Sequence, residues 1–206
     1  MSIASWIGSH SNILSVIISA AMLCVWVFYL QLLFNSYLRQ RRSSILISRG
    51  AGKGLHARCL VTNMSQEPIY VTSLIAELET DEGKREVQLT DMRELPEDLG
   101  MDPRSAMRQG SLESGQYLDI GHFDALIEQL ANDAPKIRDK TAIKALEMTV
   151  VALYGPEDLP VGAKRKFTID WHADEKTRIT PNSVITYQIH KKRERRRLRR
   201  ELERFL

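Results

Sequence analysis

The chain has 206 residues, of which 43% are hydrophobic and 27% charged, and its formal net charge is only +3. An anchor with its flanks would take about 40 residues and leave about 165, which argues against more than one soluble domain. Residues 1–42 hold three arginines and no acid, and residues 190–206 hold nine basic and three acidic residues, so the middle carries −6. We therefore predict an acidic body between two basic ends.

The run from Asn12 to Phe34 contains no formally charged side chain. At about 1.5 Å per residue it crosses the roughly 30 Å hydrocarbon core of a bilayer, so it predicts a transmembrane helix. A cleaved signal peptide would need a basic segment before an apolar stretch of about 7 to 15 residues. Residues 1–11 contain neither Lys nor Arg, and the run is too long, so we expect an uncleaved anchor.

Basic residues follow this run and none precede it. They are Arg39, Arg41, Arg42, Arg49 and Lys53. The positive-inside rule then places the N-terminus outside and the bulk of the chain in the cytoplasm, on the inner or plasma membrane. Cys24 in the run and Cys59 far downstream are not expected to pair, which agrees with a reducing compartment.

Ser11, Ser15 and Ser19 recur every four residues at the start of the predicted span. Small residues at this spacing let two helix backbones approach closely. These serines are candidates for contact with a second copy of the chain or with another membrane protein. Plain anchoring in the lipid bilayer, without a helix partner, is the alternative.

Residues 44–189 have the pattern of a mainly antiparallel β domain. Alternating or β-branched stretches predict strands at 44–49, 55–63, 69–79, 86–89, 111–120, 145–154, 164–171 and 183–189. One inserted helix is predicted because Phe123, Leu126, Ile127 and Leu130 share a helical face. Short strands without β–α–β alternation favour an immunoglobulin-like β-sandwich, with a barrel as the alternative.

The tail, residues 190–206, predicts a short basic amphipathic helix with Leu198, Leu202, Phe205 and Leu206 on one face. Candidates for contact with an anionic surface are Lys191, Lys192, Arg193, Arg195, Arg196, Arg197, Arg199 and Arg200. Anionic lipid headgroups and an acidic protein surface suit this charge. Nucleic acid ranks last, because no base-stacking or groove-reading motif accompanies it. A solvated, frayed helix is the alternative without a partner.

The predicted organisation is a short external segment (1–11), a transmembrane helix (12–34), a basic juxtamembrane linker (35–43), a cytoplasmic β-sandwich (44–189) and the basic tail (190–206). A long loop without periodicity, 91–110, is the first region to consider for a partner site, with a solvated connection as the alternative.

We find no catalytic, cofactor or metal motif. The glycine-rich stretch Arg49–Gly54 lacks the spacing of a phosphate loop and precedes a predicted strand instead of a helix. His172 with Asp174 and Glu175 is the one place where a histidine adjoins two carboxylates. The other histidines lie in segments with no recurring spacing. They are His10, His56, His122 and His190.

The sequence thus predicts a membrane-anchored binding or scaffolding module, an accessory or adaptor subunit of a membrane complex, with no catalytic residues, cofactor or metal. The first alternative is a membrane-tethered enzyme with a site near the 91–110 loop and the His172 cluster. The second is nucleic-acid binding through the tail.

Overall fold

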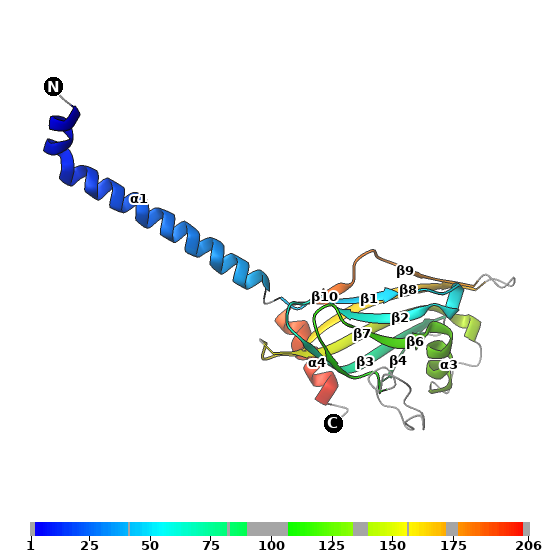
Figure 1. Cartoon of the computed structure of the whole chain (residues 1–206). Coiled ribbons are helices and arrows are strands. Elements are labelled where there is room, and N and C mark those ends of the chain that lie inside the picture. The colour runs from blue at the N-terminus through cyan, green and yellow to red at the C-terminus, as the bar shows by residue number, and fades with distance from the viewer. Residues whose placement is uncertain are drawn as a thin grey trace. The chain divides into compact units, whose positions relative to one another are not determined.

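The computed structural model describes residues 3–40, 42–81, 83–89, 107–133, 140–155, 157–171 and 177–203, and the chain forms two compact units, 1–42 and 43–206. The first unit is the single helix α1 (Ile3–Gln40) (Figure 1). Its stretch Ser11–Leu38 is long and apolar enough to cross a membrane, and the most apolar part has no buried residue. The long apolar N-terminal helix is thereby confirmed, and it extends beyond the predicted span at both ends.

The second unit is built from two antiparallel sheets, as predicted. The small sheet has the order β1 (Ile45–Arg49), β2 (Arg58–Asn63), β6 (Tyr117–His122). The large sheet has the order β10 (Tyr187–Ile189), β8 (Val161–Asp170), β7 (Ile143–Tyr154), β3 (Ile69–Thr80), β4 (Gly83–Gln88). Two short strands add to it, β5 (Gly110–Leu112) on β3 and β9 (Arg178–Pro181) on β8.

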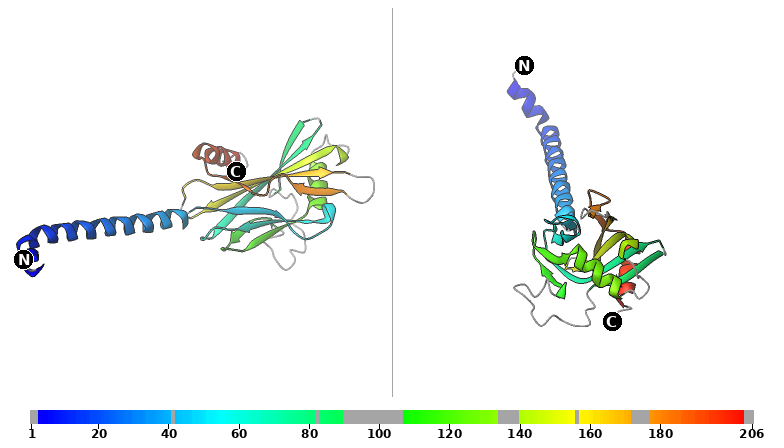
Figure 2. Two further views of the ribbon diagram at one scale, coloured as in Figure 1. Left: turned by 90° about the horizontal axis from the view of Figure 1, so that it is seen from above. Right: turned by 90° about the vertical axis from the view of Figure 1, so that its right-hand side faces the viewer.

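The two sheets face each other across one hydrophobic core (Figure 2). Alternation places every second side chain inward, so Ile47 and Val61 of the small sheet join Val71 and Met148 of the large sheet in one buried cluster. Helix α3 (Phe123–Asp133) follows β6 directly and contributes its predicted apolar face to the same cluster. The inserted helix therefore covers part of the core and is packed against it.

Two short 3₁₀ helices and one further α-helix complete the described chain. They are η1 (Gly54–His56), η2 (Lys140–Ala142) and α4 (Lys192–Glu203). Helix α4 lies on the outer face of the large sheet, where Leu198 packs with Ile75, Val151 and Ile189 in a second, separate cluster. The predicted C-terminal helix is thus present and is docked on the domain.

Some predicted strands have other bounds. The stretch 111–120 is divided into β5 and β6, which belong to different sheets, because the chain turns between them at Gly115, whose φ is +77°. Only the last three residues of the stretch 183–189 form a strand, and β9 precedes it. Residues 91–106 of the predicted 91–110 loop lie outside the described residues.

The outer edge of β1 is covered by side chains. Ile45 exchanges two hydrogen bonds with the amide of Gln188, and Ile47 exchanges two with the hydroxyl of Thr186. The buried Arg165 adds a bond to the Ile47 carbonyl at 2.5 Å. An unpaired edge strand can pair with another chain, and here the side chains of Arg165, Thr186 and Gln188 occupy backbone groups of that edge.

Candidate functional site

Helix α4 is held to the large sheet by a small apolar contact. Leu198 is only 5% exposed, and the partly buried Leu202 packs against the same cluster. A Cβ at Gly162 of β8 would lie 2.7 Å from the Leu198 Cδ1 atom, so the absence of a side chain there allows the close approach. Leu198 and Leu202 of the predicted apolar face therefore dock the helix, whereas Phe205 and Leu206 of that face lie outside the described residues.

Arg195 is a docking residue of α4. Its side chain is buried, donates from Nε to the Pro160 carbonyl at 2.9 Å and from Nη2 to the Leu159 carbonyl, and pairs with Glu157 at 3.1 Å. Charge-assisted bonds of this kind are stronger than neutral ones. Arg195, one of the eight predicted anionic-surface residues, is thus satisfied inside the domain and does not face an external surface.

The other basic side chains of the tail that the structure describes, up to residue 203, are exposed. Arg196, Arg199 and Arg200 line a shallow cavity of about 350 Å³ with Leu159 and Glu203. Arg199 is paired with Glu203 at 3.0 Å, one turn later. We call Arg196, Arg199 and Arg200 the arginine face of α4.

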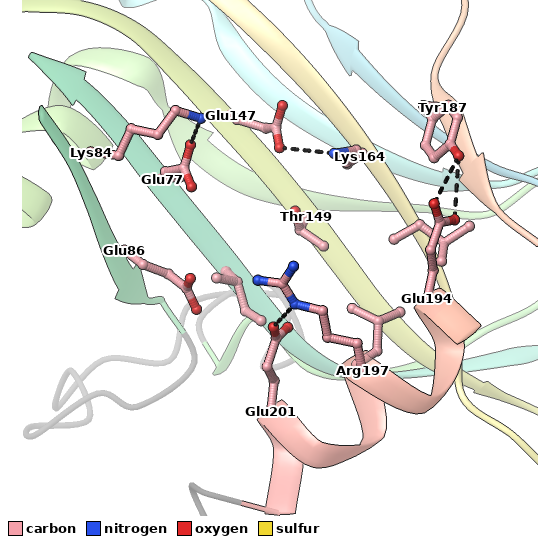
Figure 3. A pocket seen from close by; sticks show the side chains of 13 residues that line it. Glu77, Lys84, Glu86, Glu147, Thr149, Lys164, Tyr187, Glu194, Arg197 and Glu201 are labelled. Carbon is pink, nitrogen blue, oxygen red and sulfur yellow. Dashed lines mark hydrogen bonds and ion pairs between the residues drawn. The ribbon is translucent and has the colours of Figure 1, made fainter. Parts of the chain in front are cut away.

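A polar groove of about 500 Å³ lies between α4 and the outer face of the large sheet (Figure 3). Its charged lining comprises Glu77, Glu86, Glu147, Glu194 and Glu201 with Lys84, Lys164 and Arg197. Most of these charges are engaged within the groove: Lys84 with Glu77 at 2.5 Å, Lys164 with Glu147 at 3.4 Å and Arg197 with Glu201 at 2.9 Å.

These contacts also shift acid–base equilibria. The hydrogen bond and charge of Glu77 raise the pKa of Lys84, and those of Glu201 raise the pKa of Arg197. Both cations are therefore held in their charged form, and Arg197 faces the groove instead of the arginine face (Figure 3). The groove is lined mainly by charged and polar side chains, whereas small-ligand pockets are mostly apolar.

A second candidate site is formed by two histidines and a carboxylate that meet at the start of α3. The rings of His56 and His122 stack with their centroids 4.2 Å apart and their planes at 11°. Asp124 lies 2.8 Å from Nδ1 of His56, and Nδ1 of His122 lies 2.8 Å from the His56 carbonyl oxygen. We call these three residues the histidine corner.

The backbone explains how the histidine corner forms. The pairing of β2 with β6 shifts register between Cys59 and Leu60, opposite Gly121, whose φ of +116° favours glycine. Such bulges redirect the neighbouring side chain. Past the bulge, the Phe123 N–H donates to the Ala57 carbonyl at 3.0 Å, which ties the start of α3 to the end of η1.

The sequence alone places His56 and His122 in separate segments with no recurring spacing. The structure corrects this separation, because the β2–β6 pairing brings the two residues into contact. Their separation of 66 residues gives no local spacing to detect.

The glycine-rich stretch at 49–54 is a packed turn. A Cβ at Gly54, where φ is +56°, would lie 2.4 Å from the Thr177 carbonyl oxygen, and Arg49 donates to the Gly52 carbonyl at 2.7 Å. Close backbone approach thus accounts for glycine at positions 52 and 54.

Ser11, Ser15 and Ser19 are all exposed on α1. Their role in helix contacts stays a prediction. The His172 cluster and residues 90–106, on which the enzyme alternative depends, lie outside the described residues, so that alternative also stays a prediction.

No protein-family model matches this chain, and no curated protein or solved structure matches it significantly. The function must therefore be argued from these sites alone.

Proposed function

We propose that the chain is a single-pass membrane protein with its N-terminus outside, and that its β domain is a cytoplasmic binding module, an accessory or adaptor subunit of a membrane complex. The observation that carries this proposal is the exposure of the apolar side chains of α1. Leu23, Trp26 and Tyr29 are each about two-thirds exposed within the chain itself. Exposed apolar surface costs about 25 cal/mol per Å² in water, and a bilayer removes that cost.

The direction of insertion rests on the basic flank. Arginines and lysine follow the apolar stretch and none precedes it, and an excess of basic residues favours the cytoplasmic side. Residues 41–44 are all that separate the last residue of α1 from the first residue of β1. An extended chain spans at most about 3.6 Å per residue, so this short connection keeps the domain near the bilayer surface.

The arginine face supplies the binding surface of the proposed module. Because Arg195 and Leu198 fix α4 on the sheet, Arg196, Arg199 and Arg200 are presented on a preorganised helix. Each basic residue near an anionic leaflet contributes about 1 kcal/mol, within a Debye length. An anionic lipid surface is therefore the first partner proposed for this face, together with Lys191, Lys192 and Arg193.

Strand order supports the finer classification of the domain as an immunoglobulin-like sandwich. In that fold, strands A, B and E share one sheet and C, F and G the other, with C′ beside C in extended versions. The order β1-β2-β6 corresponds to A-B-E, and β4-β3-β7-β8 corresponds to C′-C-F-G. Helix α3 then occupies the E–F connection. Cys59 on β2 is a free thiol, as suits a cytoplasmic version of this architecture.

The orientation is tested by cysteine labelling in intact cells with a maleimide that does not cross membranes. Ser9→Cys and Ser43→Cys are each made in a Cys24→Ala background, where the remaining Cys59 is buried. We expect labelling of the Ser9→Cys chain in intact cells and of the Ser43→Cys chain only after permeabilisation. The reverse pattern would overturn the proposed orientation.

The binding role is tested by crosslinking the full-length chain in its native membrane, followed by purification in mild detergent. We expect a stoichiometric membrane-protein partner or a homo-oligomer. A chain that stays monomeric and captures nothing reproducibly would exclude the adaptor role. Liposome flotation with and without anionic lipid tests the arginine face separately, with Arg196→Glu/Arg200→Glu as the variant.

A further inference from the structure

We propose that the histidine corner, His56, His122 and Asp124, binds a divalent transition-metal ion of the Zn²⁺ class. One potential ligand atom from each of the three side chains lies within 4.8 Å of the others. Imidazole nitrogen suits Zn²⁺, Cu²⁺ and Ni²⁺, whereas Mg²⁺ and Ca²⁺ prefer oxygen ligands. The proposal concerns a site distinct from the arginine face and does not depend on the membrane role.

Hydrogen bonds set the ring nitrogens for metal binding. A carbonyl oxygen only accepts, so Nδ1 of His122 donates to the His56 carbonyl, and in the neutral ring Nε2 then carries the lone pair. Nδ1 of His56 likewise donates to the Asp124 carboxylate, and the neutral ring again has its lone pair on Nε2. A carboxylate or carbonyl on the second nitrogen is the usual support of a metal-binding histidine.

The local charges are compatible with a cation. Arg58 is the register partner of His122, but its guanidinium is bonded to Asp119, which also accepts the Gly121 N–H. Asp124 brings a carboxyl group to the corner, and the Ala125 N–H donates to its Oδ1 atom at 2.7 Å.

Metal binding at this corner requires one of the two imidazole rings to rotate. The lone pair of each ring lies in the ring plane, and the two planes are within 11° of parallel, so one ring must rotate for both Nε2 atoms to meet one ion. The His56 side chain is 73% exposed and can rotate, whereas the bulge and the Phe123–Ala57 bond hold the backbone of His122. When the His56 ring rotates, Asp124 becomes either a third ligand of the ion or a hydrogen-bond partner of the ligand His56. Open positions remain for water, as in metal sites that are not fully enclosed by protein.

The test uses the full-length chain in mild detergent, carrying no histidine tag and freed of metal with EDTA before dialysis. Calorimetric titration with ZnCl₂ is expected to give one ion per chain, and CoCl₂ is expected to give visible d–d absorption. His56→Ala and His122→Ala should each weaken Zn²⁺ binding at least tenfold. His190→Ala removes an exposed histidine elsewhere in the domain and should change nothing.

Asp124→Asn keeps the shape of the side chain and removes its charge, and we expect a 10- to 100-fold loss of affinity. A direct readout on the unaltered chain guards against variants that fail to fold: Zn²⁺ should shift the ¹⁵N resonances of Nε2 in His56 and His122. Unshifted resonances, or Zn²⁺ affinity that survives in the His56→Ala/His122→Ala double variant, would overturn the proposal. Equal binding of MgCl₂ with the same dependence on these residues would overturn the assigned metal class.

Discussion

The side-chain amide of Gln188 hydrogen-bonds both backbone groups of Ile45: Nε2 donates to the Ile45 carbonyl at 2.6 Å, and Oε1 accepts from the Ile45 N–H at 3.0 Å. The two residues are 143 positions apart and belong to different sheets. The amide thus replaces a neighbouring strand at the edge of β1, and it links the two sheets at the start of the domain.

Replacing Gln188 with Ala should lower the free energy of unfolding by about 1–3 kcal/mol, because two partly buried backbone groups lose their partners. Urea unfolding of the full chain in detergent, followed by pulse proteolysis, measures this. Val184→Ala in the neighbouring loop is the control, since Val184 is 92% exposed and should change stability by less than about 0.5 kcal/mol. Equal effects of the two changes would show that the amide is dispensable.

Arg195→Ala and Arg196→Ala remove the same charge from adjacent positions of α4. The first loses bonds to the Pro160 and Leu159 carbonyls and to Glu157, so we expect faster hydrogen exchange across 192–203 and a loss of about 1.5–3 kcal/mol in the docking of α4. The second is exposed and should leave exchange unchanged. If Arg196→Ala accelerates exchange as much, net charge and not Arg195 docks the helix.

Gly54→Ala and Gly115→Ala compare two left-handed glycines. At Gly115, where φ is +77° and nothing lies within 4 Å of the added Cβ, the cost should be about 1–2 kcal/mol. At Gly54 the Cβ would also meet the Thr177 carbonyl oxygen, so thermal unfolding should show a clearly larger loss. Similar melting temperatures for the two variants would contradict the packed turn.

Burial, and to a smaller extent Asp119, raise the pKa of Cys59 to about 12. The thiol of an unfolded cysteine has a pKa of about 8.5, so its contribution to stability is fully present below that pH and is lost as pH rises toward about 12. In a Cys24→Ala background, stability should fall more steeply above about pH 8.5 with Cys59 than with Cys59→Ala. Maleimide should also label Cys59 only after unfolding. Parallel pH profiles would contradict this shift.

The strands and both predicted α-helices of the domain could be anticipated because their patterns are local. Alternation marks β2 and β8, and the i, i+3, i+4, i+7 spacing marks α3. The turn at Gly115 was hidden within a stretch that reads as one strand. Strand β9, Arg178–Pro181, is short and contains a proline, so it has little strand pattern of its own and depends on its pairing with β8.

The sites were harder to anticipate because they depend on contacts between distant segments. In the tail, Arg195 and Arg196 have the same chemistry in the sequence, and only the Pro160 and Leu159 carbonyls separate their roles. The histidine corner likewise needs the β2–β6 register and its bulge, neither of which the spacing of His56 and His122 encodes.

The bonds around Ser44 and Ile45 also decide how the domain bears mechanical load. Tension on the helix enters the fold at these two residues. There the Ser44 N–H donates to the Ser65 hydroxyl and the Ser44 carbonyl accepts from Met64, beyond the end of β2, while Ile45 is held by Gln188 from β10. A pulling force is therefore divided between both sheets at its first point of contact, and peeling β1 away requires bonds on its two sides to break together.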